Sequence, residues 1–291
     1  MKYQYDFSVA GISFRWITGM PLELEERYRA FLLEEPRTPE ILYEVLTGRP
    51  SRDRRGEREL YAGEFCRITE DGQYRYRTFP YSKVHKEREV TLVRRRECAD
   101  QYRLYLPKEV QEDFKRAKNW SFYMAFEEMF YTRGRILLHA AYVETEEGAV
   151  LFSGPSGIGK STQAQLWEQY GGGVTMNGDR AVLYEKEGRI FAAGSPYAGS
   201  SGVYRNYQSP VRAIVILSQG ERNQIQKLKE SRCILPLMRE STFAYMDEKM
   251  KKKQAELLFS AAEKIPVYTF QCRKDASAVE DLRRRFRQDG V

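Results

Sequence analysis

Apolar and polar residues alternate along the first part of the chain, which is the pattern of half-buried β-strands. Two alternating runs, at residues 3–9 and 12–16, flank the turn signal Ala10-Gly11. The pair Asp71-Gly72 lies between two further runs, at 66–69 and 74–77, and predicts a β-hairpin. Additional strands are expected at 41–46, 89–93 and 102–106. Together these runs predict an N-terminal antiparallel β-rich domain.

Pro107 marks a change of pattern. Residues 108–132 contain neither Gly nor Pro and favour a helix, which ends at Gly134. We therefore predict two domains that this helix joins. The first, at residues 1–108, is β-rich and recognises a substrate or a partner, and the second spans residues 109–291.

The second domain alternates strand and helix patterns. Apolar runs at 135–143 and 149–153 are joined by a short polar turn and should be antiparallel neighbours, unlike the strands of an all-parallel sheet. Further strands are expected at 174–176, 181–184, 189–193, 211–217 and 265–270, and helices at 162–170 and 242–262. Ser277-x-x-Glu280 has the sequence of a capping box and predicts a last helix. The fold class is thus α+β overall, with an α/β second domain built on a mixed sheet.

The composition is that of an ordinary globular chain, with 291 residues, of which 42% are hydrophobic and 31% charged. No apolar run approaches the roughly 20 residues of a membrane span, and the first residues lack the apolar centre of a signal peptide. The four cysteines, Cys66, Cys98, Cys233 and Cys272, form no C-x-x-C pair. They are expected to be reduced thiols, which predicts a cytoplasmic protein with no membrane partner.

The net charge of +7 comes largely from arginine groups at residues 52–58, 94–96 and 283–287. A nucleic-acid partner is one interpretation of these groups. We favour the alternative, in which solvated arginines are interleaved with Glu and Asp. A phosphorylated or acidic substrate would also suit this positive field.

The strongest chemical signal is at residues 154–161, which read G-x-x-x-x-G-K-S, the phosphate-binding loop. Glycines let backbone N–H groups converge on an anion, and the N-terminus of the following helix adds unpaired donors and a positive dipole end. Lys160 would reach the β- and γ-phosphates, and the Ser161 hydroxyl would hold Mg²⁺. The residues predicted to bind ATP are Gly154, Pro155, Ser156, Gly157, Ile158, Gly159, Lys160, Ser161 and Thr162.

Two further residues are candidates for the chemistry. Asp179 follows the strand at 174–176, where it could be a second metal ligand or a turn residue after Gly178. His139 lies in the strand that precedes the loop strand. On spacing alone, a single histidine in an apolar strand is more often a core residue than a catalytic one.

Residues from about 134 to 217 resemble the catalytic domain of HPr kinase/phosphorylase, which shares its nucleotide site with ATP-dependent phosphoenolpyruvate carboxykinase. The similar pieces are Leu138-His139-Ala140, the loop 154–161 and Asn177-Gly178-Asp179-Arg180. In that family a histidine precedes the loop, and an Asp-Asp pair after the loop helix supplies a general base and a Mg²⁺ ligand. The resemblance therefore implies catalytic roles for His139 and Asp179. It is nearest to HPr-kinase-like bacterial proteins with a different N-terminal domain, some of which phosphorylate the hydroxyl of a peptide or a small molecule.

The chain departs from the family at two positions. Gly178 stands where the family has the first Asp of the pair, its proposed acid/base, so the resemblance leaves the phosphorolysis reaction open and the kinase base unassigned. Thr162 stands where the HPr enzymes have Glu. The stretch 194–206 is again similar to the HPr-kinase-like proteins. Arg205 is expected to offset charge on the transferred group, and Ser200-Ser201-Gly202 to meet the acceptor or the phosphates.

These observations predict an ATP- and Mg²⁺-dependent kinase that phosphorylates a hydroxyl of a peptide, a protein or a small molecule. The predicted catalytic residues are His139, Lys160, Asp179 and Arg205, the metal ligands are Ser161 and Asp179, and Lys160 should be exposed in the empty loop. Family members are often oligomers, so a homo-oligomer is a further expectation. Two alternatives stay open: a nucleotide-binding regulator with slow or absent turnover, and a carboxykinase-like enzyme that acts on a small carboxylic acid.

Overall fold

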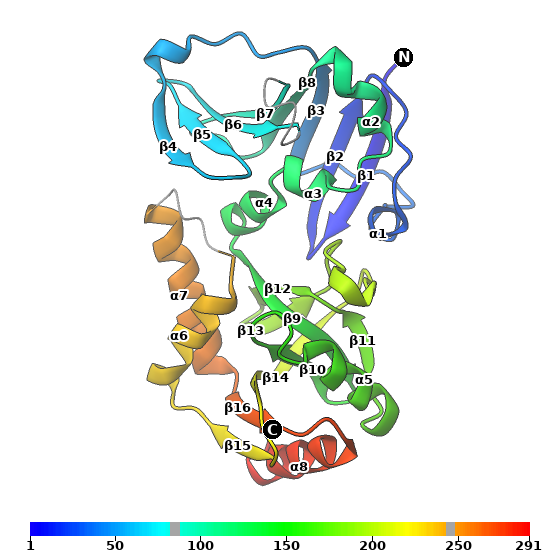
Figure 1. Cartoon of the computed structure of the whole chain (residues 1–291), viewed down its shortest axis with the longest axis vertical. Coiled ribbons are helices and arrows are strands. Elements are labelled where there is room, and N and C mark those ends of the chain that lie inside the picture. The colour runs from blue at the N-terminus through cyan, green and yellow to red at the C-terminus, as the bar shows by residue number, and fades with distance from the viewer. Residues whose placement is uncertain (82–87, 243–247) are drawn as a thin grey trace. The chain divides into compact units, whose positions relative to one another are not determined.

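The computed structural model describes residues 1–81, 88–242 and 248–291. Contacts divide the chain into two compact units, Met1–Met129 and Phe130–Val291, which we describe one at a time (Figure 1). The sequence placed a boundary at 108/109. The division by contacts falls later, because the helical segments that follow the first sheet pack against that sheet.

The described part of the first unit contains an eight-stranded sheet with the order β1-β2-β3-β8-β7-β6-β5-β4. The strands are β1 (Tyr3–Val9), β2 (Ile12–Thr18), β3 (Ile41–Thr47), β4 (Arg58–Ala62), β5 (Arg67–Glu70), β6 (Tyr74–Pro80), β7 (Glu89–Arg95) and β8 (Gln101–Leu106). The hairpin predicted at Asp71-Gly72 is confirmed, since β5 and β6 pair antiparallel on either side of it. The all-antiparallel expectation is wrong, because β3 pairs parallel with both β2 and β8. Parallel strands must be joined by a long connection, so local turn signals do not predict which strands pair in this way.

The helix expected over 108–132 is broken into short pieces. These are η2 (Lys108–Val110), α2 (Gln111–Lys115), α3 (Trp120–Tyr123) and α4 (Phe126–Thr132), and earlier in the unit lie α1 (Glu26–Arg29) and η1 (Arg54–Gly56). Ala125 has a φ of 49°, which a helix does not allow and which separates α3 from α4. The break lets Trp120 and Phe126 both pack on Trp16 of β2, with ring centroids 5.3 and 6.2 Å away.

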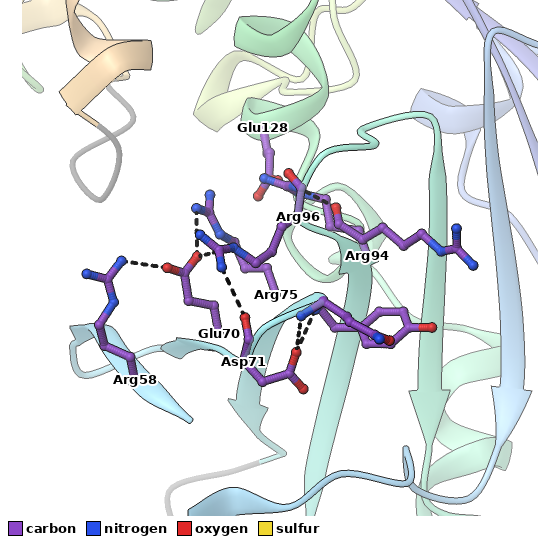
Figure 2. A network of polar contacts seen from close by, with 10 residues as sticks. Arg58, Glu70, Asp71, Arg75, Arg94, Arg96 and Glu128 are labelled. Atoms are coloured by element: carbon purple, nitrogen blue, oxygen red, sulfur yellow. Dashed lines mark hydrogen bonds and ion pairs between the residues drawn. The ribbon is translucent and has the colours of Figure 1, made fainter. Parts of the chain in front are cut away.

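Arginines of the first sheet are held by carboxylates. Figure 2 shows the Glu70 side chain between Arg58, Arg75 and Arg96, with closest N–O distances of 2.5, 3.2 and 3.5 Å. Beside it, Glu128 of α4 pairs with Arg94 of β7. Arginines that the sequence singled out for their positive charge therefore contact acidic partners within the unit.

We expect Glu128→Gln to lower the free energy of unfolding by about 3 kcal/mol at neutral pH. The Glu128 side chain is only 6% exposed and lies against Arg94 and Arg77, so the variant leaves buried guanidinium charge with less compensation. Burial raises the pKa of Glu128, but the two guanidinium groups hold that pKa below its ordinary value. A lowered folded-state pKa means that the stabilisation is present above the unfolded-state pKa and is lost as pH falls through the folded-state pKa.

The measurement is urea unfolding of wild type and variant at neutral and acid pH. Glu59→Gln is the matched control, because Glu59 and its partner Arg67 are both more than half exposed and their pair should contribute less than about 1 kcal/mol. Equal losses in the two variants, or a Glu128→Gln deficit that does not shrink as pH falls, would contradict the prediction.

In the second unit two strands pass from one sheet to another. The strands are β9 (Arg135–Thr145), β10 (Gly148–Ser153), β11 (Val174–Asn177), β12 (Arg180–Lys186), β13 (Arg189–Ala193), β14 (Gln208–Gln219), β15 (Gln224–Lys227) and β16 (Val267–Cys272). The first half of β9 pairs with β12 and its second half with β10, both antiparallel. β14 pairs antiparallel with β13 and then parallel with β10 and β16. The sheets are therefore mixed, and the antiparallel pairing of the loop strand with the His139 strand is confirmed.

Helices cover both faces of these sheets (Figure 1). On one face α6 (Glu230–Glu240) and α7 (Glu248–Lys264) bury Leu237 and Leu258 against one side of β9, including Leu138. On the other face α5 (Lys160–Tyr170) and α8 (Ala276–Gln288) bury Trp167 and Phe286. The unit is a three-layer α/β/α arrangement, and among the described residues no helix is long and apolar enough to cross a membrane.

The helices differ from the sequence expectation in three places. The helix expected over 242–262 is α7, and 243–247 lie outside the described residues. The last helix begins two residues earlier than a capping box at Ser277 requires, because Asp275 is its N-cap and accepts a hydrogen bond from the Ser277 N–H. Helix α6 was not expected, since Pro236 lies inside it.

Candidate active site

The candidate site lies where β9 changes partner. His139 is paired with Arg180, the first residue of β12, and the next residue, Ala140, is paired with Ser153, the last residue of β10. The Ser153 hydroxyl donates to the His139 carbonyl at 2.9 Å. The loop that follows β10 and the turn that precedes β12 thus begin at neighbouring points of one strand.

The loop 154–159 connects β10 to α5, and Lys160 is the first residue of that helix. The Lys160 ammonium donates to the carbonyls of Gly154 and Pro155 at 2.7 and 3.1 Å. The residue is only 7% exposed, so the expectation of an exposed lysine is wrong. An ammonium without an anion satisfies its donors on the nearest carbonyl oxygens, and here these belong to the loop itself.

The backbone of the loop and the start of the following helix have features that suit an anion. Gly157 and Gly159 have φ values of 78° and 117°, which glycine adopts without strain, and no atom lies within 4 Å of where a side chain would begin. The N-terminus of the 11-residue helix α5 follows directly, with unpaired N–H groups and a positive dipole end. The predicted ligands Ser161 and Thr162, in the first turn of α5, are both partly exposed.

A buried asparagine builds the turn that carries Asp179. The Asn177 side-chain oxygen accepts hydrogen bonds from the backbone N–H groups of Asp179 and Arg180, at 3.0 and 2.7 Å. Its amide donates to the carbonyls of Ser195 and Tyr197. Asn177 is fully buried, so this set of bonds fixes the turn between β11 and β12. The sequence had grouped Asn177 with Asp179 without assigning it this role.

Gly178 has no room for a side chain. A Cβ atom there would lie 1.6 Å from the Ser201 hydroxyl oxygen, which itself donates to the Ala198 carbonyl. The loop that contains η3 (Gly199–Ser201) therefore packs on the turn beside Asp179. A carboxylate cannot be placed at 178 unless this loop moves.

His139 lies between two carboxylates. Its Nε2 is 3.3 Å from an Asp179 oxygen, and its Nδ1 is 3.3 Å from an oxygen of Glu240, the last residue of α6. The second Asp179 oxygen is 3.6 Å from Arg180 Nε. All three side chains of the contact, at 20%, 27% and 14% exposure, retain access to solvent, so a substrate atom can reach them.

The charges of the site act on one another. Burial raises the pKa of Asp179, but the hydrogen bond from His139 and the charges of Arg180 and Lys160 outweigh it and leave that pKa below its ordinary value. Burial lowers the pKa of Lys160, and Glu240 and Asp179 oppose this effect. Asp179 is therefore an anion at neutral pH, as a ligand of a hard cation must be.

Glu240 was missed by the sequence reasoning. It is held beside His139 by the chain that follows it: Ser241 forms an isolated bridge with Leu138, and the Thr242 N–H donates to the Leu137 carbonyl at 2.9 Å. Thr242 also accepts from Arg180 at 2.9 Å. No sequence pattern indicated this contact, because Pro236 argues against a helix in the segment that ends at Glu240.

The structure brings His139, Lys160 and Asp179 into one site, and Arg205 lies apart from their contacts. Arg205 is exposed in the segment between η3 and β14, and its role stays a prediction. Within the described ranges no group of three or more His, Cys, Asp or Glu is arranged to hold a metal ion by itself. A Mg²⁺ ion at Asp179 and Ser161 would complete its shell with phosphate oxygens and water, which is its usual coordination in phosphoryl-transfer sites.

Comparisons with known proteins show distant likenesses to solved structures only. No protein-family model and no curated protein matches the chain. Among solved structures, the Hpr(Ser) kinase/phosphatase from Coxiella burnetii matches with a TM-score of 0.32 and 16% sequence identity, over 53% of this chain and 97% of its own.

Proposed function

We propose that the chain is an ATP- and Mg²⁺-dependent kinase that transfers the γ-phosphate to a hydroxyl of a peptide, a protein or a small molecule. The observation that carries the proposal is the shared site of Lys160, His139 and Asp179. A phosphate loop alone would fit any nucleotide-binding protein. Here the charge of Asp179 acts on Lys160, and an Asp179 carboxylate oxygen lies 3.3 Å from His139 Nε2.

Each residue has a task in this reaction. The Lys160 ammonium leaves its loop carbonyls and binds the β- and γ-phosphates, while the N–H groups that begin α5 bind phosphate oxygens. Asp179 and the Ser161 hydroxyl would hold the metal, which would offset negative charge on the phosphates. The acceptor oxygen bonds to the γ-phosphorus as the bond to the β–γ bridging oxygen breaks, and the hydroxyl proton passes to Nε2 of His139.

The test is incubation of the protein with labelled ATP, Mg²⁺ and either fractionated lysate or peptides encoded near its gene. A labelled peptide, protein or small molecule would identify the acceptor class. ATP binding without any labelled product or ATP consumption would favour the nucleotide-binding regulator, and no ATP binding would exclude both.

We expect Lys160→Ala to weaken ATP binding at least tenfold, because the loop loses the ammonium that we propose binds the phosphates. Isothermal titration with ATP measures the affinity. The variant also loses two hydrogen bonds to loop carbonyls, so its melting temperature should fall by a few degrees without loss of the fold. Lys229→Ala, which removes an exposed charge just before α6, is the control and should change neither quantity. Unchanged ATP affinity in Lys160→Ala would contradict the proposed nucleotide site.

A further inference from the structure

A cavity of about 410 Å³ lies in the first unit, beside the segment that connects β3 to β4. Three guanidinium groups and one carboxylate belong to its lining, which consists of Arg49, Pro50, Arg52, Arg54, Glu89 and Thr91. A second cavity shares three of these residues, but there four glutamates stand against three arginines. The excess of cationic groups is therefore confined to the first cavity, which we call the arginine cavity.

Carboxylates compensate the three arginines unequally. Arg54 forms an ion pair with Glu89. Arg52 is less well paired, because its Nε lies 3.6 Å from the nearest oxygen of Glu57, which is longer than a hydrogen bond. Arg49 is exposed, and its side chain has no hydrogen bond or ion pair to any residue that the structure describes. The arginine cavity thus has one cation without a counterion and a second one that is only loosely paired.

The Arg52 guanidinium is buried, unlike that of a solvated surface arginine. Its side chain is only 8% exposed, and its Cζ lies over the Tyr76 ring, 5.0 Å from the ring centroid. Nη2 donates to the Thr78 hydroxyl at 3.4 Å, whereas Nη1 has no hydrogen-bond partner within the described ranges. A buried donor without a partner costs free energy, and an anion that accepts a hydrogen bond from it removes that cost.

A hydroxyl group lies on the same side of the sheet. Thr91 is opposite Thr78 in the antiparallel pairing of β6 with β7, so the two side chains share one face. This is the face that Arg52 covers, because Arg52 contacts Thr78. The cavity therefore combines guanidinium groups with a hydroxyl, and both are donors from which phosphate and carboxylate oxygens accept hydrogen bonds.

We propose that the arginine cavity binds an anion of the carboxylate or phosphate class, with Arg49 and Arg52 as its cationic ligands and Thr91 as a hydroxyl donor. Its volume of about 410 Å³ is in the usual range of small-molecule sites, so the anionic group can be part of a larger molecule. All of these residues belong to the first unit, so binding here does not rest on the kinase function proposed above.

The test is isothermal titration of the full chain at low ionic strength with two probes, citrate as a carboxylate and inorganic phosphate. Both titrations use the Lys160→Ala background, so that the phosphate loop contributes less. We expect at least one probe to bind at millimolar concentration or below. Arg49→Ala should weaken that binding about tenfold, the usual effect of losing one charge-assisted contact, and its fold should persist because the side chain makes no contact that is lost. The tighter probe identifies the anion as a carboxylate or a phosphate.

Three further variants make the test specific. Arg29→Ala is the matched control, because it removes an exposed arginine of α1 and should bind the probe as the parent does. Arg52→Lys keeps the charge but loses the planar fork, and should weaken binding. Glu89→Gln removes the carboxylate that pairs with Arg54, and should tighten binding several-fold.

The sign of the Glu89→Gln effect separates an anion site from a merely structural cluster, since loss of a structural ion pair would not improve binding. Four results would overturn the proposal. They are binding of neither probe, equal losses in Arg49→Ala and Arg29→Ala, unchanged binding in both Arg49→Ala and Arg52→Lys, and weaker binding in Glu89→Gln. Equal losses in the first pair would mean that the anions respond only to the net charge of the chain.

Discussion

Asp179→Asn is expected to abolish Mg²⁺-dependent turnover, with a loss of at least about 10³-fold, the upper range for one electrostatic group in an active site. Two effects combine in this variant. A neutral amide is a poor ligand for a hard cation. It also removes the anion whose two oxygens lie 3.3 Å from His139 Nε2 and 3.6 Å from Arg180 Nε. ATP binding in the absence of Mg²⁺ should persist, because the loop and Lys160 are unchanged.

Turnover and metal-free ATP affinity are measured on the same preparation. The control is Glu187→Gln, which removes a carboxylate from the exposed turn between β12 and β13, and it should retain wild-type activity. The pKa of Asp179 lies below its ordinary value, so the charge is complete at neutral pH and is lost only as pH falls through that lowered pKa. Wild-type turnover in Asp179→Asn would reduce Asp179 to a turn residue.

The sequence predicted the parts of the site that depend on local pattern. The strand–loop–helix context of residues 154–161 follows from a short apolar run, glycines and a helix-forming stretch, and β10, the loop and α5 have that order. The antiparallel pairing of β9 with β10 follows from their short connection. These features need only neighbouring residues, so one sequence suffices to predict them.

Contacts between residues far apart in the chain could not be predicted in the same way. The parallel pairs of β3 with β2 and β8 join strands that are far apart in the chain, and no turn signal reports them. Glu240 meets His139 only because α6 forms in spite of Pro236 and because Ser241 bridges to Leu138. Lys160 is buried because its ammonium folds onto the loop carbonyls, a contact that the motif alone does not specify. In each case tertiary contacts decided an outcome that local propensity left open or opposed.

His139→Ala separates the two candidates for the base. His139 and Asp179 touch, so either could receive the proton of the acceptor hydroxyl. Asp179 is held as an anion by His139, Arg180 and Lys160, and a carboxylate with a lowered pKa is a weak base. The His139 imidazole is the other proton acceptor at this contact, and we propose it as the base. The proposal therefore assigns the base to His139 and the metal to Asp179.

We expect His139→Ala to lower kcat by about 10²–10⁴-fold, the usual effect of losing a general base, while ATP affinity stays nearly intact. The side chain is 20% exposed and not part of the hydrophobic core, so the melting temperature should change little. The pH dependence of kcat adds an independent measurement: an acid limb in the wild-type profile reports the general base, and the residual activity of the variant should lack this limb. Turnover within about twofold of wild type, or an acid limb that persists in His139→Ala, would instead assign the proton to Asp179.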